Sequence, residues 1–185
     1  MIDGTRTKQK GNVVQGHQAG RDVNVYQLAR SESALGALME WVQSEMEVDP
    51  GFCEIVETLQ HFRDPNADDS RDLETKLVDT GRAQQLSEAL KLKEAFFKLM
   101  QKHLVRESAQ RTLGHLLGVI WQRFNQEVRP LIDRGESALV VDAAILSKVI
   151  SPVVQELGPA SVLVQSLHIS GMLYYLAGNC HIRWD

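Results

Sequence analysis

The sequence is poor in the residues that build disulfide, zinc or redox sites. Its 185 residues include only two cysteines, Cys53 and Cys180, and aromatic residues make up only 6%. Cysteines this far apart match no zinc or redox motif, so we expect reduced thiols. Met1 is followed by a polar stretch that lacks the apolar run of about 7–15 residues found in signal peptides. We therefore predict a cytoplasmic protein without a cleaved leader.

Long hydrophobic runs and an excess of basic charge are also missing. The longest nearly uncharged stretch, residues 158–180, is interrupted by polar side chains and glycines, whereas a membrane span needs about 20 predominantly apolar residues. We predict no membrane segment. The 20 basic and 24 acidic residues give a net charge of −4, which disfavours a module that binds nucleic acid through overall basicity.

Recognisable catalytic motifs are absent as well. The sequence has no Gly-x-Ser-x-Gly, no His-Glu-x-x-His and no cysteine in a local motif with histidine. The glycines of residues 16–20 lack the lysine and serine of a phosphate-binding loop. The histidines do not show the short paired spacings of a zinc site, although Cys180 and His181 are adjacent. We predict no catalytic residue, cofactor or metal.

Two other functions stay open from the residues alone. A small helical hydrolase or ligand-binding protein would draw histidines and nearby carboxylates into a pocket between helices; its histidines would be His103, His115 or His168. A nucleic-acid binder would contact the phosphate backbone through basic side chains of the N-terminal segment. The candidate phosphate contacts are Lys8, Lys10 and Arg21.

The chain divides by composition into two segments. Residues 1–27 are rich in glycine and contain no leucine, phenylalanine or tryptophan before Val25. Within them, residues 12–15 and 22–26 alternate polar and β-branched residues around a glycine-rich turn, which is typical of two short strands. A lone hairpin is marginal in water, so this arm must pack against the body or against copies of itself.

Residues 28–185 show apolar residues at helical spacing. The predicted helical segments are 35–46, 52–62, 73–78, 83–103, 113–131, 138–157 and 167–176. A strand is the competing interpretation for residues 138–141. Pro130 is expected to kink or restart its helix, and Gly178 and Asn179 to end the last one. The prediction is a mainly α single domain of six or seven helices, with an N-terminal β-hairpin-like arm and a short C-terminal strand over residues 180–185.

Two stretches resemble a known family. Gly11–Gln15 together with Ala19–Asn24 is similar to a short element near the front of many bacterial conflict-system proteins. His168–Trp184 resembles the end of the small helical C-terminal domains of three-component ABC ATPase systems, to which Lamassu-type anti-phage defences are related. In such systems an SMC- or Rad50-like ATPase senses DNA, a small middle component joins it, and an effector is tethered through its helical domain.

The resemblance implies a non-enzymatic adaptor, because no effector domain precedes the helices of this sequence. Its partners would be the ABC ATPase, an effector subunit and further copies of itself, with nucleic acid contacted through the ATPase and no membrane. Aromatic and arginine side chains are the usual anchors of protein interfaces. The implied interface residues are Arg21, Asp22, Asn24, Tyr174, Tyr175, Cys180, His181, Ile182 and Trp184.

Overall fold

The structure is a computed structural model of the chain. It describes residues 34–45, 55–66, 71–158, 161 and 163–184. All of these belong to one unit of the chain, Ser31–Asp185. The predicted arm, residues 1–27, with its hairpin and its candidate phosphate contacts, lies outside the described residues, as does Cys53.

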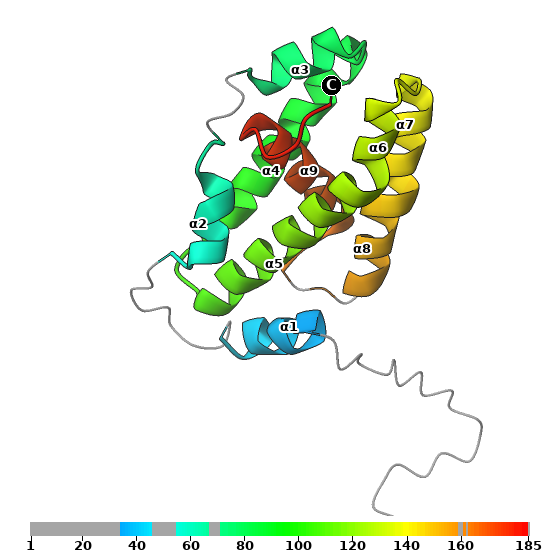
Figure 1. Cartoon of the computed structure of the whole chain (residues 1–185). Helices are drawn as coiled ribbons and strands as arrows, with labels where there is room; N and C mark the ends of the chain where they lie inside the picture. Colours follow the sequence, from blue (N-terminus) through cyan, green and yellow to red (C-terminus); the bar gives the residue numbers. More distant parts are fainter. Residues whose placement is uncertain (1–33, 46–54, 67–70, 159–160, 162, 185) are drawn as a thin grey trace, which may run out of the picture. The chain divides into compact units, whose positions relative to one another are not determined.

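The described residues are helical, as predicted (Figure 1). The helices are α1 (Ala34–Glu45), α2 (Glu57–Arg63), α3 (Leu73–Asp79), η1 (Ala83–Gln85), α4 (Leu86–His103), α5 (Glu107–Arg123), η2 (Phe124–Val128), α6 (Arg129–Asp133), α7 (Ala138–Ala144), η3 (Ile145–Ile150), α8 (Ser151–Leu157) and α9 (Ser166–Gly178). Because η1, η2 and η3 join their neighbours without a break, the described part of the chain forms seven continuous helices and no strand. The predicted helical class and helix number are confirmed, and residues 138–141 are helical.

Two of the long helices contain a π-helical segment directly before a proline. η2 precedes Pro130 in the first turn of α6, and η3 precedes Pro152 in the first turn of α8. Proline has no N–H group, and its ring displaces the carbonyl group four residues earlier in a helix. For Pro130 and Pro152 that carbonyl group lies inside η2 and η3, respectively. The wider π turn makes room for the ring. Pro130 therefore distorts its helix, as expected, without ending it.

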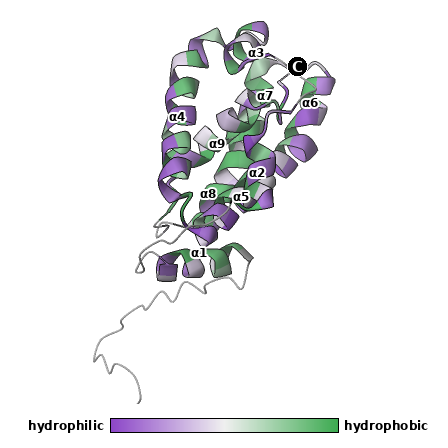
Figure 2. Ribbon diagram, turned by 90° about the vertical axis from the view of Figure 1, so that its left-hand side faces the viewer, coloured by the Kyte–Doolittle hydropathy of each residue, from purple (hydrophilic) through white to green (hydrophobic). Residues whose placement is uncertain are grey.

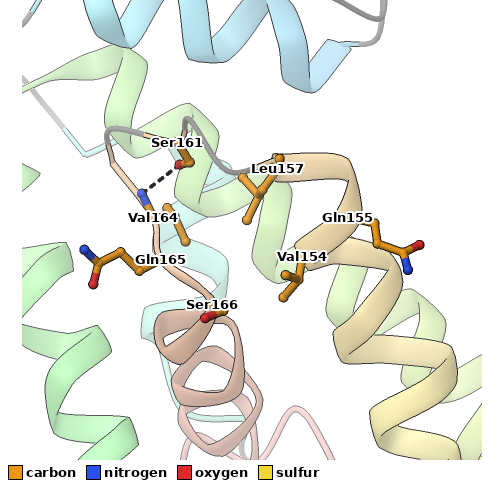
Figure 3. Close-up of a pocket in the computed structure, with 8 residues that line it drawn as sticks. Val154, Gln155, Leu157, Ser161, Val164, Gln165 and Ser166 are labelled. Atoms are coloured by element: carbon orange, nitrogen blue, oxygen red, sulfur yellow. Dashed lines mark hydrogen bonds between the residues drawn. The ribbon is translucent and has the colours of Figure 1, made fainter. Parts of the chain in front are cut away.

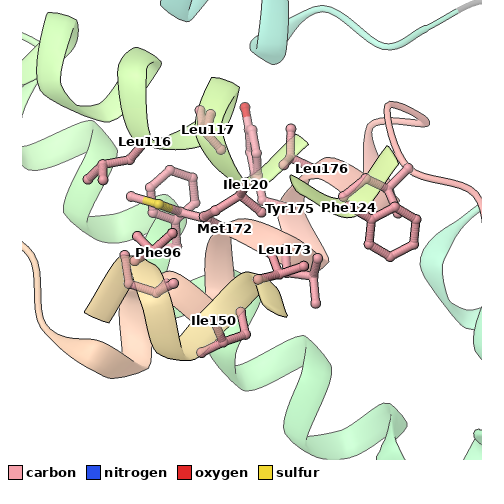
Figure 4. Close-up of a cluster of buried hydrophobic side chains, with 14 of the residues drawn as sticks. Phe96, Leu116, Leu117, Ile120, Phe124, Ile150, Met172, Leu173, Tyr175 and Leu176 are labelled. Atoms are coloured by element: carbon pink, nitrogen blue, oxygen red, sulfur yellow. The ribbon is translucent and has the colours of Figure 1, made fainter. Parts of the chain in front are cut away.

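Helices α4 and α9 pack against each other along the centre of the unit. Gly171 allows this close approach, because a Cβ atom there would overlap the Leu92 carbonyl oxygen and would lie 2.9 Å from Phe96 Cβ. Figure 4 shows Phe96 and Met172 among the buried side chains at this contact. The Phe96 and Tyr175 rings meet edge to face with their centroids 5.2 Å apart.

Helix α5 also contacts α1 and α2. The sequence has glycine at positions 114 and 118 of this helix, a spacing that predicts a close backbone neighbour. A Cβ atom at Gly114 would lie 3.2 Å from the Leu59 backbone nitrogen of α2, whereas at Gly118 the nearest atom is Phe62 Cε2 at 3.9 Å. The predicted close backbone neighbour is therefore confirmed. It is α2 of the same unit, and Gly114 is the residue that allows the close approach.

Helix α2 begins later than the apolar spacing predicts. Its described part starts at Glu57, and Val56 is extended with φ −66° and ψ 141°. The Val56 N–H group donates to Gln110 Oε1 of α5 at 2.7 Å. That long-range bond holds Val56 outside the helix, so the predicted helical start of this segment is wrong for residues 55 and 56.

The predicted C-terminal strand is wrong. The N–H groups of His181 and Ile182 both donate to the Leu176 carbonyl oxygen of α9, at 2.9 and 3.3 Å. Their donors are therefore used by the end of the helix and not by a neighbouring strand. For the chain to turn back at the end of α9, one residue must adopt the left-handed backbone conformation. That residue is Cys180 (φ 64°), whereas Gly178 and Asn179, which accept this conformation more readily, do not adopt it here.

By length and composition, one described helix, Ala138–Leu157, could cross a membrane. In this structure it packs against α5, η2 and α9, and it buries Val141, Val149 and Val153. Figure 2 shows hydrophobic residues of α5, α8 and α9 gathered toward the interior, whereas α4 is largely hydrophilic on its outer side. The apolar character of this helix is thus partly explained by the core that it helps to build.

Candidate functional site

The end of the chain is tied to the loop after α2. Asn179 Nδ2 donates to the carbonyl oxygens of Phe62 and Arg63, at 3.0 and 3.3 Å. His181 Nε2 lies 3.0 Å from the carbonyl oxygen of Asp64. A carbonyl oxygen can only accept, so this imidazole nitrogen carries the proton. These bonds fix the segment after α9, which carries four of the predicted interface residues: Cys180, His181, Ile182 and Trp184.

A buried lysine holds the turn at Cys180. Lys76 of α3 is only 1% exposed, and its ammonium group donates to the Ala177 carbonyl oxygen at 2.7 Å and to Cys180 Sγ at 3.3 Å. An ammonium group can be buried at tolerable cost only where it is hydrogen-bonded. Lys76 therefore acts as a positioning residue for the end of α9, a role that its charge alone did not indicate in the sequence.

Trp184 packs between α9 and η2. Its ring stacks on Tyr174 with centroids 5.9 Å apart and meets the edge of Phe124 at 6.0 Å. The residue is 4% exposed. Its Nε1–H donor has no hydrogen-bond acceptor among the described residues, although a buried indole N–H group usually finds one.

A small pocket of about 170 Å³ lies beside Trp184, between α7, η3 and α9. Its lining residues are Gln85, Asp142, Ile145, Leu146, Ile150, Ser170, Leu173, Tyr174 and Trp184. Asp142 is the acid of the pocket, and both of its oxygens accept: one from Arg82 Nε at 2.8 Å, the other from Gln85 Nε2 at 2.9 Å. The pocket therefore has both polar and apolar walls, and the charge of Asp142 is paired with Arg82.

Exposed apolar side chains also occur on α7 and η3, two of the elements that line this pocket. Leu139 is 80% exposed and Leu146, which lines the pocket, is 61% exposed. Val140 is also exposed. Exposed apolar patches are typical of interaction sites. The sequence pattern did not find it, because apolar spacing treats every leucine of a helix as a core residue.

A larger pocket, of about 550 Å³, lies between α8 and the start of α9 (Figure 3). Its lining residues are Val154, Gln155, Leu157, Gly158, Ser161, Val164, Gln165 and Ser166. This lining has amide, hydroxyl and aliphatic groups but no titratable side chain. General acid–base chemistry needs such a side chain in reach of the substrate, and none is present among the described residues that line this pocket.

The three histidines of the hydrolase hypothesis lie outside the two pockets. His103, His115 and His168 line neither of the two pockets. His61 and His181 have ring centroids 5.3 Å apart, but among the described residues no group of three or more histidine, cysteine or acidic side chains could hold a metal ion. The condition that we set for a hydrolase, a histidine cluster with a carboxylate in a cleft, is not met in these two pockets.

The histidines predict a pH dependence of stability. Burial lowers the pKa of His103, His168 and His181 below the ordinary value of 6.5, and the charges of Lys102 and Arg106 lower that of His103 further. The unfolded chain therefore binds more protons below that value than the folded chain does. The stability that these neutral histidines contribute is fully present above pH 6.5, and it is lost as the pH falls below that value. We expect a lower urea midpoint at about pH 5.5 than at about pH 7.5.

The matched control for this measurement is His181→Gln, which keeps a side-chain N–H donor but removes one titrating group. Its urea midpoint should fall less between the two pH values than that of the natural sequence. A midpoint that is the same at both pH values in the natural sequence would contradict the prediction.

The predicted interface residues are placed unequally by the structure. Tyr175, Cys180, Ile182 and Trp184 are buried, and Tyr174 and His181 are half-buried. Arg21, Asp22 and Asn24 lie outside the described residues. The structure places Cys180 and His181 against α3 and the end of α2, and it places Tyr174 and Trp184 together beside Phe124 of η2. Contact of any of them with a partner stays a prediction.

A known family matches most of this fold. The model of C-terminal domain 9 (CTD9) of the ABC-three component (ABC-3C) systems matches residues 72–184, from the start of α3 to Trp184. Neither a curated protein nor a solved structure matches the chain. The match includes both pockets, the Lys76–Cys180 contact and the exposed leucines of α7 and η3, and leaves out α1 and α2.

Proposed function

This chain belongs to the family of C-terminal domains 9 of the ABC-three component systems, and from this premise we propose that it is a non-enzymatic assembly subunit of such a system. It acts by binding protein partners: an SMC- or Rad50-like ABC ATPase, an effector subunit, or both. We place it in the cytoplasm, in an anti-phage defence complex related to the Lamassu type. Nucleic acid is contacted through the ATPase.

The observation that carries the proposal is the extent of the family match. It spans 72–184, and most of the residues of the hydrophobic core, from Leu73 to Trp184, lie in this range. The two pockets contain no histidine and no unpaired acid. A rigid helical unit with an exposed apolar face is suited to binding other proteins.

The N-terminal arm is the second part of the proposal. We assign Arg21, Asp22 and Asn24 to contacts between copies of this chain or with a partner, because the arm has too few apolar side chains to fold alone. Lys8, Lys10 and Arg21 would add contacts with phosphate if the complex lies on nucleic acid.

The experiment is co-expression of the full chain with the ABC ATPase and the remaining component of its system. We expect one complex on a sizing column with light scattering, and a mass for the isolated chain above that of the monomer. A version that lacks residues 1–26, shown by circular dichroism to keep its helices, should be a monomer. If no component of the system co-purifies with the full chain, the proposal is wrong.

A further inference from the structure

We propose that α1 is a strap that covers a docking site at the N-terminal end of α5, and that an acidic amphipathic helix of a partner protein takes its place there. The site is formed by Ser108 and Arg111, and in the free chain Glu45 and Trp41 of α1 fill it. This inference rests on the proposed function, since it identifies how one component of the system is bound.

Helix α1 is held to the rest of its unit by few contacts. It packs mainly against α5, with a smaller contact to α8 (Figure 1). Among its described side chains, Leu35 and Val42 are buried, whereas α9, a helix of similar length, buries seven residues. An isolated helix of about 12 residues is marginal in water, and elements with few buried contacts open at a lower free energy than the core does. We therefore expect α1 to leave α5 without unfolding the core.

A carboxylate of α1 holds the beginning of α5. Glu45 Oε2 accepts from the Ser108 backbone N–H group at 3.2 Å and from Ser108 Oγ at 2.6 Å. The first N–H groups of a helix have no partner within that helix, and in the described part of the chain Arg106, the residue before α5, provides no side-chain cap. Glu45 supplies the cap from another helix, and its negative charge is favoured at the positive end of the α5 dipole.

A second contact pairs a cation of α5 with an aromatic ring of α1. The Arg111 guanidinium carbon lies 5.9 Å from the centre of the Trp41 ring, within the range of a cation–π attraction. Arg111 also pairs with Glu107 of its own helix, a contact that does not depend on α1. The N-terminal end of α5 thus offers the hydrogen-bond donors of Ser108 and a cation in one arrangement.

These groups define the kind of helix that the site accepts. Ser108 needs a carboxylate and Arg111 an aromatic ring, and α1 supplies them from positions 45 and 41. Residues four positions apart lie on the same face of a helix, and Val42, which is fully buried, adds an apolar side chain. The partner segment is therefore an amphipathic helix with an aromatic residue one turn before an acidic one, bound as a helix in a groove.

The boundary of the family match separates the site from its cover. Ser108 and Arg111 lie inside the matched range 72–184, whereas α1 lies outside it. Helix α2 is also outside but is fastened on two sides, because it packs at Gly114 of α5 and its last carbonyl oxygens accept from Asn179. The docking surface thus belongs to the matched domain, and α1 is the separate element that covers it.

Hydrogen exchange of the full chain, followed by mass spectrometry, tests the strap. We expect residues 34–45 to exchange much faster than α4 and α9, because α1 opens by itself. Val42→Asp places a charge at a fully buried position and should remove the remaining protection of α1, while α4 and α9 keep theirs. The matched control is Gln43→Asp at the exposed neighbouring position, which should exchange like the natural sequence. Equal protection of α1, α4 and α9 in the natural chain would overturn the proposal.

Binding to each purified component of the system tests the docking site. A released strap no longer competes with the partner helix, so Val42→Asp should bind one component about tenfold more tightly than the natural chain does. Gln43→Asp should bind like the natural chain. Adding Arg111→Ala to Val42→Asp should reverse most of the gain, because the cation that faces the partner's aromatic ring is lost.

The outcomes separate this proposal from the proposed function. If a component binds the natural and the Val42→Asp chains equally well, or if Arg111→Ala leaves the gain unchanged, the docking site is wrong and the proposed function stands. If no component binds either chain, the proposed function fails and the docking site with it. If Val42→Asp instead makes the chain self-associate, the occupant is α1 of a second copy, and a partner protein is excluded as the occupant.

Discussion

Replacing Gly171 by alanine is expected to lower the free energy of unfolding by about 3 kcal/mol. The new Cβ atom would overlap the Leu92 carbonyl oxygen and would lie 2.9 Å from Phe96 Cβ. Neither neighbour is the mobile end of a flexible side chain, so α9 must move away from α4. At this chain length the loss corresponds to a melting temperature lower by roughly 6–12 °C, measured by calorimetry.

The matched control is Gly118→Ala in α5. The nearest atom to its Cβ position is Phe62 Cε2 at 3.9 Å, which is ordinary contact. Alanine favours a helix over glycine by about 0.8–1.0 kcal/mol, so this variant should be as stable as the natural sequence or more stable. Equal melting temperatures for the two variants would show that α4 and α9 do not pack as closely as described.

Replacing Phe96 by alanine is expected to cost about 3–5 kcal/mol. Its side chain is fully buried and packs edge to face on Tyr175 with centroids 5.2 Å apart. Truncation removes both the buried apolar surface and the ring contact, and leaves a cavity between α4 and α9. Urea unfolding followed by circular dichroism should show a much lower midpoint with a similar slope.

The neighbouring residue provides the comparison. Phe97 is on the same helix and is 40% exposed, so Phe97→Ala should cost less than about 1 kcal/mol. Phe96→Leu, which keeps most of the buried volume, should recover a large part of the loss. A cost for Phe97→Ala equal to that for Phe96→Ala would mean that the wrong face of α4 has been assigned to the core.

This pair of residues also shows how far the sequence predicts the fold. The spacing of apolar residues predicts α4, and Gly81, with φ +72°, lies in the turn that follows α3. The same spacing puts Phe97 on the main apolar stripe and Phe96 beside it, whereas the structure buries Phe96. The face of α4 is selected by the close approach of α9 at Gly171, a contact between residues that are far apart in the sequence.

The candidate site was predictable only in part. The C-terminal aromatic residues were singled out from the sequence, and the structure places Tyr174 and Trp184 together beside a pocket. Lys76 could not be singled out in this way, because its acceptor, the Ala177 carbonyl oxygen, is 101 positions away in the sequence. Leu139 and Leu146 were assigned to a helix but not to its exposed side, since residues 138–157 have more apolar side chains than one buried face can hold.

The two π segments have a consequence for comparing this chain with other members of its family. A π turn holds about one residue more than an α turn. The side chains after η2 or η3 therefore point in the directions that an unbroken α-helix would give to the side chains one position earlier in the sequence. A relative without Pro130 or Pro152 can lose one residue there and keep every buried side chain in place. Single-residue alignment gaps are therefore expected at 124–128 and 145–150, inside helices rather than between them.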